Sequence, residues 1–102
     1  MKAGHFLSAG QLEQVAQRFR LLGEPMRLRI LQTVCRNPRT VNEIVEAVGA
    51  TQANVSKHLS MLAGAGILAR KKEGQRVYYG MKDQLALKLC TLVHKHLAPQ
   101  ME

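Results

Sequence analysis

The feature that most restricts how this chain folds is a pair of short amphipathic segments joined by only three residues. Apolar residues recur at helical spacing in residues 41–48 and again in residues 51–63. Thr40 and Thr51 precede the two segments as N-cap residues, and Gly49 closes the first. Two short helices joined by a three-residue turn that contains Gly form a helix-turn-helix.

Two further helices are predicted before this unit. Ser8, followed three residues later by Gln, reads as a capping box for a helix over residues 9–22, which Gly23 ends. Pro25 suits the first turn of a second helix, since its missing N–H has no partner there, and Asn37-Pro38 stops that helix.

The pattern changes after Gly66. Two short strand-like runs, Ile67–Lys71 and Arg76–Met81, flank a four-residue connection in which Gly74 is free to adopt positive φ, as a hairpin requires. Asp83 then opens a last helix, and Pro99 is expected after its end. The predicted fold is therefore mainly α with a small β-hairpin: one winged helix-turn-helix domain over residues 1–102.

Charge points to the partner. The net charge is +8, from 15 Lys and Arg against 7 Asp and Glu, and such an excess suits a polyanion such as nucleic acid. No apolar run approaches the roughly 20 residues of a membrane span, and two cysteines are too few for a disulfide framework. We expect a cytoplasmic protein that is neither membrane-bound nor an enzyme and has no cofactor, because no phosphate loop, triad or carboxylate pair is present.

A helix-turn-helix followed by a basic hairpin reads DNA, with its second helix in the major groove. The outward face of residues 51–63 carries amides and hydroxyls that pair with base edges, and no Asp or Glu. The candidate DNA-binding residues on this helix are Thr51, Gln52, Ala53, Asn54, Ser56, Lys57 and His58. Those on the hairpin, expected at phosphates or in the minor groove, are Arg70, Lys71, Lys72, Gln75 and Arg76. A polar solvated surface is the alternative interpretation of both sets.

At this point the sequence resembles the ArsR/SmtB repressors. Residues 21–31, LLGEPMRLRIL, are similar to the family's L-x-x-P-x-R-L-x-I-L, and residues 52–62, QANVSKHLSML, to its recognition helix Q-x-x-V-S-x-H-L-x-x-L. Residues 66–68 and 74–79, GIL and GQRVYY, resemble its wing. The resemblance covers about residues 12–97. It implies a homodimer held by the first and last helices, a palindromic double-stranded operator, and repression relieved by an inducer.

The family's metal motifs are not reproduced. Residues 39–42, RTVN, stand where many members carry Cys-x-Cys, and in the last helix Asp83 matches one zinc ligand while Leu85 and Pro99 replace others. We therefore assign no metal site, with Cys90, His94 and His96 as weak candidates.

Two cysteines suggest another inducer. A branch of the family senses persulfides or oxidants through one Cys on the second helix and one on the last. Cys35 and Cys90 lie on those two elements, displaced from the usual positions by about one and two turns, and are candidate thiol sensors. Inert packing as small buried hydrophobes is the other interpretation. The alternative function is a DNA- or RNA-binding protein without an inducer site, although few aromatic residues are present to stack RNA bases.

Overall fold

The computed structural model describes residues 6–101, with side chains up to residue 99, so residues 1–5 and 102 of the expected 1–102 domain lie outside the described part. Within it, five helices and a three-stranded sheet confirm the winged helix-turn-helix. The elements are α1 (Ala9–Leu22), α2 (Pro25–Val34), β1 (Arg39–Thr40), α3 (Val41–Val48), α4 (Gln52–Gly64), β2 (Leu68–Glu73), β3 (Arg76–Met81) and α5 (Leu85–Met101).

The helix ends follow from local chemistry that the sequence announces. Ser8 and Gln11 form a full capping box at the start of α1, and Thr40 and Glu43 form another at the start of α3. Gly49 ends α3 with φ at 70°, a left-handed conformation in which a side chain is strained. The predicted starts and ends of these helices are thereby confirmed.

The elements from α2 to β3, which we call the body, enclose one apolar core. Its helices supply side chains at the predicted inner positions, and Ile30, Ile44, Val55 and Leu59 are all fully buried. The buried hydrophobic set of the described residues is Leu22, Ile30, Leu31, Val34, Ile44, Val48, Val55, Leu59, Leu62, Ile67, Leu68 and Ala86.

The sheet is larger and its turn tighter than predicted. β1 pairs antiparallel with β3, giving the strand order β1-β3-β2. The reason is that Thr40, as the N-cap of α3, needs an extended backbone, which then pairs with Tyr78. The expected four-residue connection is wrong: β2 continues to Glu73 and leaves a two-residue turn, with φ at 65° for Gly74.

The expected end of the last helix before Pro99 is also wrong, because α5 continues through this residue. A proline there removes one hydrogen bond, to the carbonyl of Lys95. Lys95 lies on an exposed stretch of the helix, where water replaces the lost donor, so the helix tolerates the proline one turn from its end.

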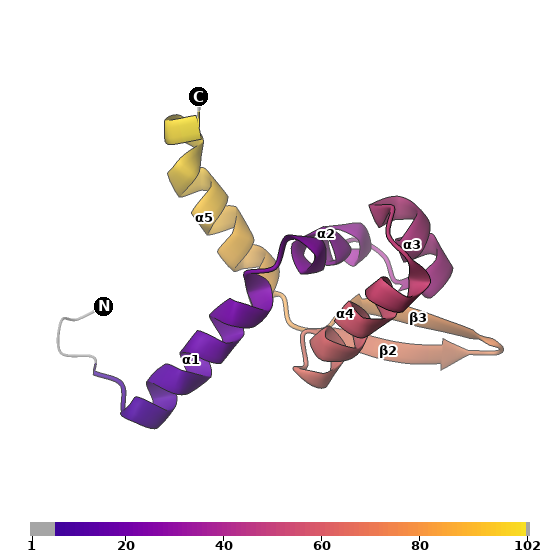
Figure 1. Ribbon diagram of the computed structural model, residues 1–102, viewed down its shortest axis with the longest axis horizontal. Helices are drawn as coiled ribbons and strands as arrows, with labels where there is room; N and C mark the ends of the chain where they lie inside the picture. The colour runs from indigo at the N-terminus through magenta and orange to yellow at the C-terminus, as the bar shows by residue number, and fades with distance from the viewer. Residues whose placement is uncertain (1–5, 102) are drawn as a thin grey trace.

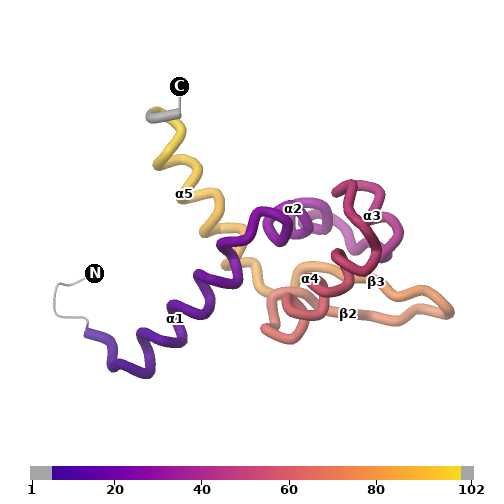
Figure 2. The backbone as a smooth tube through the Cα atoms, in the orientation of Figure 1, coloured from indigo at the N-terminus to yellow at the C-terminus, as the bar shows by residue number. Residues whose placement is uncertain are grey.

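Helices α1 and α5, which we call the arms, extend from the body on the side opposite the tip of the β2–β3 hairpin (Figure 1). The chain enters the body from one arm and returns to the other, and the two arms diverge (Figure 2). No helix among residues 6–101 combines the length and apolar character that a membrane crossing requires.

Candidate nucleic-acid interface

Helix α4 presents a continuous polar face. Gln52, Ala53, Asn54, Ser56 and Lys57 are all exposed, whereas Val55 and Leu59 on the opposite side are fully buried in the core. This alternation fixes the rotation of the helix about its axis, so the amide and hydroxyl side chains point outward together.

The start of α4 is arranged for an anion. The Thr51 hydroxyl oxygen accepts from the Asn54 N–H at 3.1 Å, and the Thr51 carbonyl accepts from the Val55 N–H at 3.0 Å. The N–H groups of Gln52 and Ala53, in the first turn, have no acceptor within the helix and point along its axis. A phosphate oxygen bound there also gains from the helix dipole.

His58 does not belong to this outward face, and its expected exposure is wrong. It is 8% exposed, the one buried polar side chain among the residues with described side chains. Its Nδ1 accepts a hydrogen bond from Nε of Arg27 on α2, at 3.1 Å. At helical spacing His58 follows Val55 by three positions, which places it at the edge of the buried face.

The basic residues of the hairpin are divided between its two faces. Side chains alternate along a strand, and Leu68 is buried against the helices, so Arg70 and Lys72 lie on the face that α4 also covers. Both are exposed, because the hairpin extends past the end of the core. These two cations therefore flank α4 on one side of the sheet.

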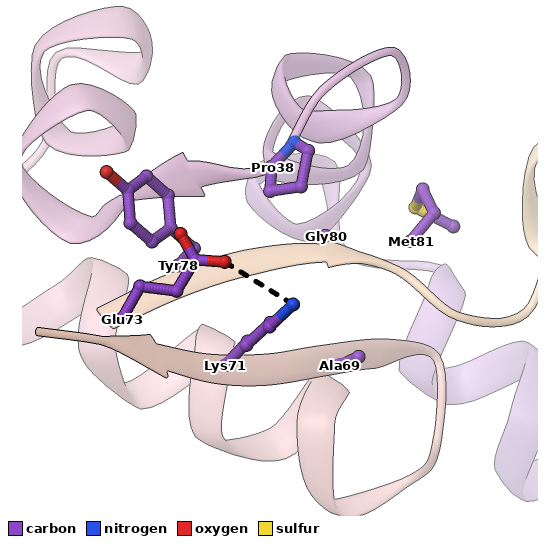
Figure 3. A pocket seen from close by; sticks show the side chains of 7 residues that line it. All are labelled: Pro38, Ala69, Lys71, Glu73, Tyr78, Gly80 and Met81. Atoms are coloured by element: carbon purple, nitrogen blue, oxygen red, sulfur yellow. Dashed lines mark ion pairs between the residues drawn. The ribbon is translucent and has the colours of Figure 1, made fainter. Parts of the chain in front are cut away.

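Lys71 lies on the other face. Its Nζ is 3.3 Å from Oε2 of Glu73, and both side chains are exposed. Figure 3 shows the two on the same side of the hairpin, beside Tyr78, where they border a shallow hollow of about 420 Å³ over Pro38 and Gly80. Arg76 is opposite Glu73 in the ladder, and Gln75 is in the turn. The hairpin residues that the sequence grouped together thus separate into two sets.

Three arginines that contribute to the basic charge point into the protein instead. Arg18 of α1 donates to the Ala65 carbonyl at 3.0 Å and is 3.3 Å from the Asp83 carboxylate. Arg29 donates to the Val48 carbonyl at 2.9 Å. The positive charge available for a polyanion is consequently concentrated on α4 and the hairpin more than composition suggests.

An apolar groove of about 440 Å³ runs between the arms. Its lining is almost wholly hydrophobic, with the thiol of Cys90 and the ring of His94 at its side. The groove is lined by Phe19, Leu22, Gly23, Leu28, Leu89, Cys90, Val93, His94 and Leu97.

Both cysteines line a second cavity, of about 450 Å³, between α2 and α5. Cys35 is the residue that ends α2, Cys90 lies in the second turn of α5, and each is a free, partly exposed thiol. Arg29, Gln32 and Thr91 add polar groups to the same cavity. The structure thus brings the two cysteines of this chain to one cavity.

The weak metal candidates do not converge. Across residues 6–99 no three His, Cys, Asp or Glu side chains form a cluster able to hold a metal ion. His94 shares a groove with Cys90, while His96 is exposed. Asp83 is engaged elsewhere: its carboxylate accepts from the Leu85 N–H at 3.0 Å and pairs with Arg18.

Comparison with known proteins gives a consistent family. Residues 24–70 match the model described as bacterial regulatory protein, arsR family. A probable mercury resistance operon repressor of Streptomyces lividans is 38% identical over 71 residues, covering 70% of this chain and 57% of the relative, so the chain spans little more than half of that protein.

Two mycobacterial proteins are similar over most of their length. The uncharacterized HTH-type transcriptional regulator Rv0081 of Mycobacterium tuberculosis is 31% identical over 81% of this chain and 74% of its own. Its crystal structure superposes with a TM-score of 0.83, over 92% of this chain and 95% of that one, at 28% identity. The homodimeric winged helix-turn-helix DNA-binding domain of Mb0332 from Mycobacterium bovis gives 0.80, at 28% identity, over 100% and 94%.

Proposed function

The chain belongs to the arsR family of bacterial regulatory proteins, and we propose that it is a homodimeric repressor that binds a palindromic DNA duplex and is released by a thiol-reactive inducer. The observation that carries the DNA-binding part is the shared side of α4 and β2. The amide and hydroxyl face of α4 lies beside the exposed cations Arg70 and Lys72, without an intervening carboxylate on α4.

This arrangement divides the work of binding. Gln52 and Asn54 have the donor and acceptor pairs that match an adenine edge, and Ser56 bonds to several bases. Lys57, Arg70 and Lys72 hold phosphates, which fixes the position of α4 without reading the sequence. Lys71 and Arg76, on the other face beside Glu73, are expected to add less.

The arms supply the second copy. The groove between α1 and α5 exposes apolar side chains that a twofold partner would cover, and the similar Mb0332 domain is homodimeric. A twofold dimer places two α4 helices about one DNA turn apart, so the duplex that fits both is an inverted repeat.

Selection of DNA tests this part. A random-sequence duplex pool is enriched by binding to the wild type, and the affinities for the enriched and the starting pools are compared by fluorescence anisotropy over a range of salt. We expect a clear preference for the enriched pool and a steep fall of both affinities with salt. Equal affinity for the two pools at moderate salt would contradict a sequence-specific repressor.

The inducer part rests on the cavity that Cys35 and Cys90 share. An oxidant accepts two electrons as the two thiols lose their protons and join through their sulfur atoms, and a persulfide joins them with an additional sulfur. Such a bridge ties the end of α2 to α5, that is, the body to an arm. Bridging needs Cα atoms within about 7 Å, or somewhat more with an extra sulfur, and partly exposed thiols react first.

The switch is tested with the enriched duplex and with diamide or a low-molecular-weight persulfide. The wild type is expected to lose the mass of two hydrogens with diamide and about tenfold or more of its DNA affinity, and to recover both with dithiothreitol. Cys35→Ser and Cys90→Ser each retain full affinity after the same treatment. A wild type that binds DNA unchanged after its thiols are modified would make them packing residues.

A thiophilic metal ion is the second candidate inducer, favoured by one finding: the Streptomyces relative is named as a probable mercury resistance repressor. Thiolates are the ligands that such soft ions prefer, and Cys90 has His94 beside it on the apolar groove. Release from the enriched duplex by Hg²⁺ that requires Cys90 and His94 but not Cys35 would identify this mode. Release that requires both cysteines and no metal identifies the redox mode.

A further inference from the structure

The side chain of Arg27 joins three parts of the molecule. Its Nε donates to Nδ1 of His58 at 3.1 Å, its Nη2 approaches the Met61 sulfur at 3.2 Å, and its Nη1 donates to the Leu21 carbonyl at 3.2 Å. His58 and Met61 are on α4, and Leu21 is in the last turn of α1. One guanidinium on α2 thus contacts the recognition helix and an arm together.

We propose that Arg27 and His58 are positioning residues that set the angle of α4 for base recognition, on which the DNA-binding function proposed above depends. Neither needs to touch DNA for this. Van der Waals packing of Val55 and Leu59 holds α4 against the core, but apolar contacts are not directional and permit small rotations and slides of a helix. A hydrogen bond from a planar guanidinium to a buried ring is directional and restricts that motion.

The geometry also fixes the state of the histidine. A ring nitrogen that accepts a hydrogen bond carries no hydrogen, so Nδ1 is the bare nitrogen and Nε2 bears the proton. Which nitrogen is protonated is assigned here from the donor, because Arg27 Nε has a hydrogen and can only donate. This tautomer is an observable consequence of the pair that does not depend on DNA.

A second arginine holds the far end of α4. Arg18, on the arm α1, donates to the carbonyl of Ala65, the residue that caps α4, and pairs with Asp83 just before the arm α5. The recognition helix is therefore held by polar groups at its middle and at its end, and both holds lead to the arms. A displacement of the arms in the dimer would pass to α4 through these two side chains.

Three variants separate positioning from packing. His58→Leu keeps the volume of the ring but removes the acceptor, His58→Asn restores an acceptor at the position of Nδ1, and Arg27→Met keeps the stem but removes the donor. Arg20→Met is the matched control, since Arg20 is an exposed α1 arginine that pairs with Glu13. Each is measured against the wild-type-enriched duplex and the random pool, and each is checked for dimer mass by sedimentation.

We expect His58→Leu and Arg27→Met to lose about tenfold in affinity for the enriched duplex, the size of a lost charged hydrogen bond, with unchanged affinity for the random pool. His58→Asn recovers most of the loss, and Arg20→Met behaves as wild type. The double variant loses no more than the worse single variant, because both remove the same interaction.

A second measurement uses no DNA. Side-chain ¹⁵N NMR of the wild type is expected to show His58 protonated on Nε2 with a bare, hydrogen-bonded Nδ1, a pattern that changes in Arg27→Met. Protonation on Nδ1 would overturn the proposal. So would a His58→Leu variant that keeps the full preference for the enriched duplex, or an equal loss toward both pools. A wild type without any preference would instead overturn the proposed function, and the positioning role with it.

Discussion

The body and the arms of this protein solve the burial of apolar residues differently. In the body the large side chains of the core are fully enclosed, with Ile44 and Leu62 at 0% exposure. Along the arms, Phe19 is 60% exposed and Leu92 64%. The large exposed hydrophobic residues among those described are all on the arms or adjoin them, with Met61 of α4 as the exception.

The difference shows that the body is a packed structure and that the arms are one side of an interface. Full burial of a large aliphatic or aromatic side chain is worth about 1.5–3 kcal/mol, so covering the arm residues in two copies gives on the order of 10 kcal/mol before the cost of association. The same chain therefore stores its stability in two places: within the monomer for the body and between copies for the arms.

The strongest way to break this contrast is to place a charge on an arm. Leu92→Asp is expected to weaken the dimer by about three orders of magnitude, because each copy would bury an unpaired carboxylate in the interface. Sedimentation velocity at micromolar protein checks this, with circular dichroism to show that the body stays folded. Asn37→Asp, which adds the same charge at an exposed position of the body, is expected to remain dimeric. A dimeric Leu92→Asp variant would place the interface elsewhere.

One truncation made in both regions sharpens it. Leu59→Ala, at a fully buried position of α4, is expected to lower the free energy of unfolding by about 3 kcal/mol through lost burial and the cavity left behind. Leu92→Ala is expected to lower it less, and by an amount that depends on protein concentration. Urea denaturation at two protein concentrations measures both; equal, concentration-independent losses would remove the distinction.

A third comparison concerns recognition. Gln52→Ala on α4 is expected to cost about 1–2 kcal/mol of discrimination between the enriched duplex and the random pool, since its amide is placed for a base edge. Lys72→Ala should weaken both affinities about equally and reduce their salt dependence. Gln17→Ala, an exposed glutamine on the arm α1, is the matched control and should change neither. Discrimination that survives Gln52→Ala would remove this residue from base reading.

The smallest effect comes from a motif that both regions share. The capping box of α1 ends in the neutral Gln11, and that of α3 in Glu43, whose pKa is lowered from about 4.5. The main cause is the Thr40 backbone N–H, which donates to Oε1 of Glu43 at 2.9 Å, and Arg39 and Arg76 add to it.

A lowered folded-state pKa stabilises the protein above the unfolded value, and this stabilisation disappears as the pH falls through the folded value. The thermal midpoint of the wild type should therefore decline more between pH 5 and pH 3, around these carboxyl values, than that of Glu43→Gln, which keeps the acceptor but cannot ionise there. Parallel pH profiles of the two proteins would contradict the assignment.

The sequence predicted the elements that local chemistry determines. Caps at Ser8, Thr40 and Thr51 and the turn at Gly49 gave the helix boundaries, because each supplies a hydrogen bond or a backbone conformation that only a few residue types allow. The apolar face of α4 likewise followed from its spacing.

The features that the sequence did not predict depend on tertiary contacts. β1 has only two residues and no alternation, so it exists only because β3 is there to pair with it. The inward direction of Arg18, Arg27 and Arg29 was hidden in a count of positive charge. His58 was assigned to the DNA side because its neighbours are outward, although its donor is distant in sequence.

The most direct test of the central claim is the stoichiometry and symmetry of the DNA complex. Native mass spectrometry of the wild type with the enriched duplex, together with the sequence of that duplex, reports both in one sample. The account predicts two protein chains per duplex and an inverted repeat with half-sites about one helical turn apart. One chain per duplex, or an enriched sequence without twofold symmetry, would contradict a body that reads DNA and arms that pair two copies.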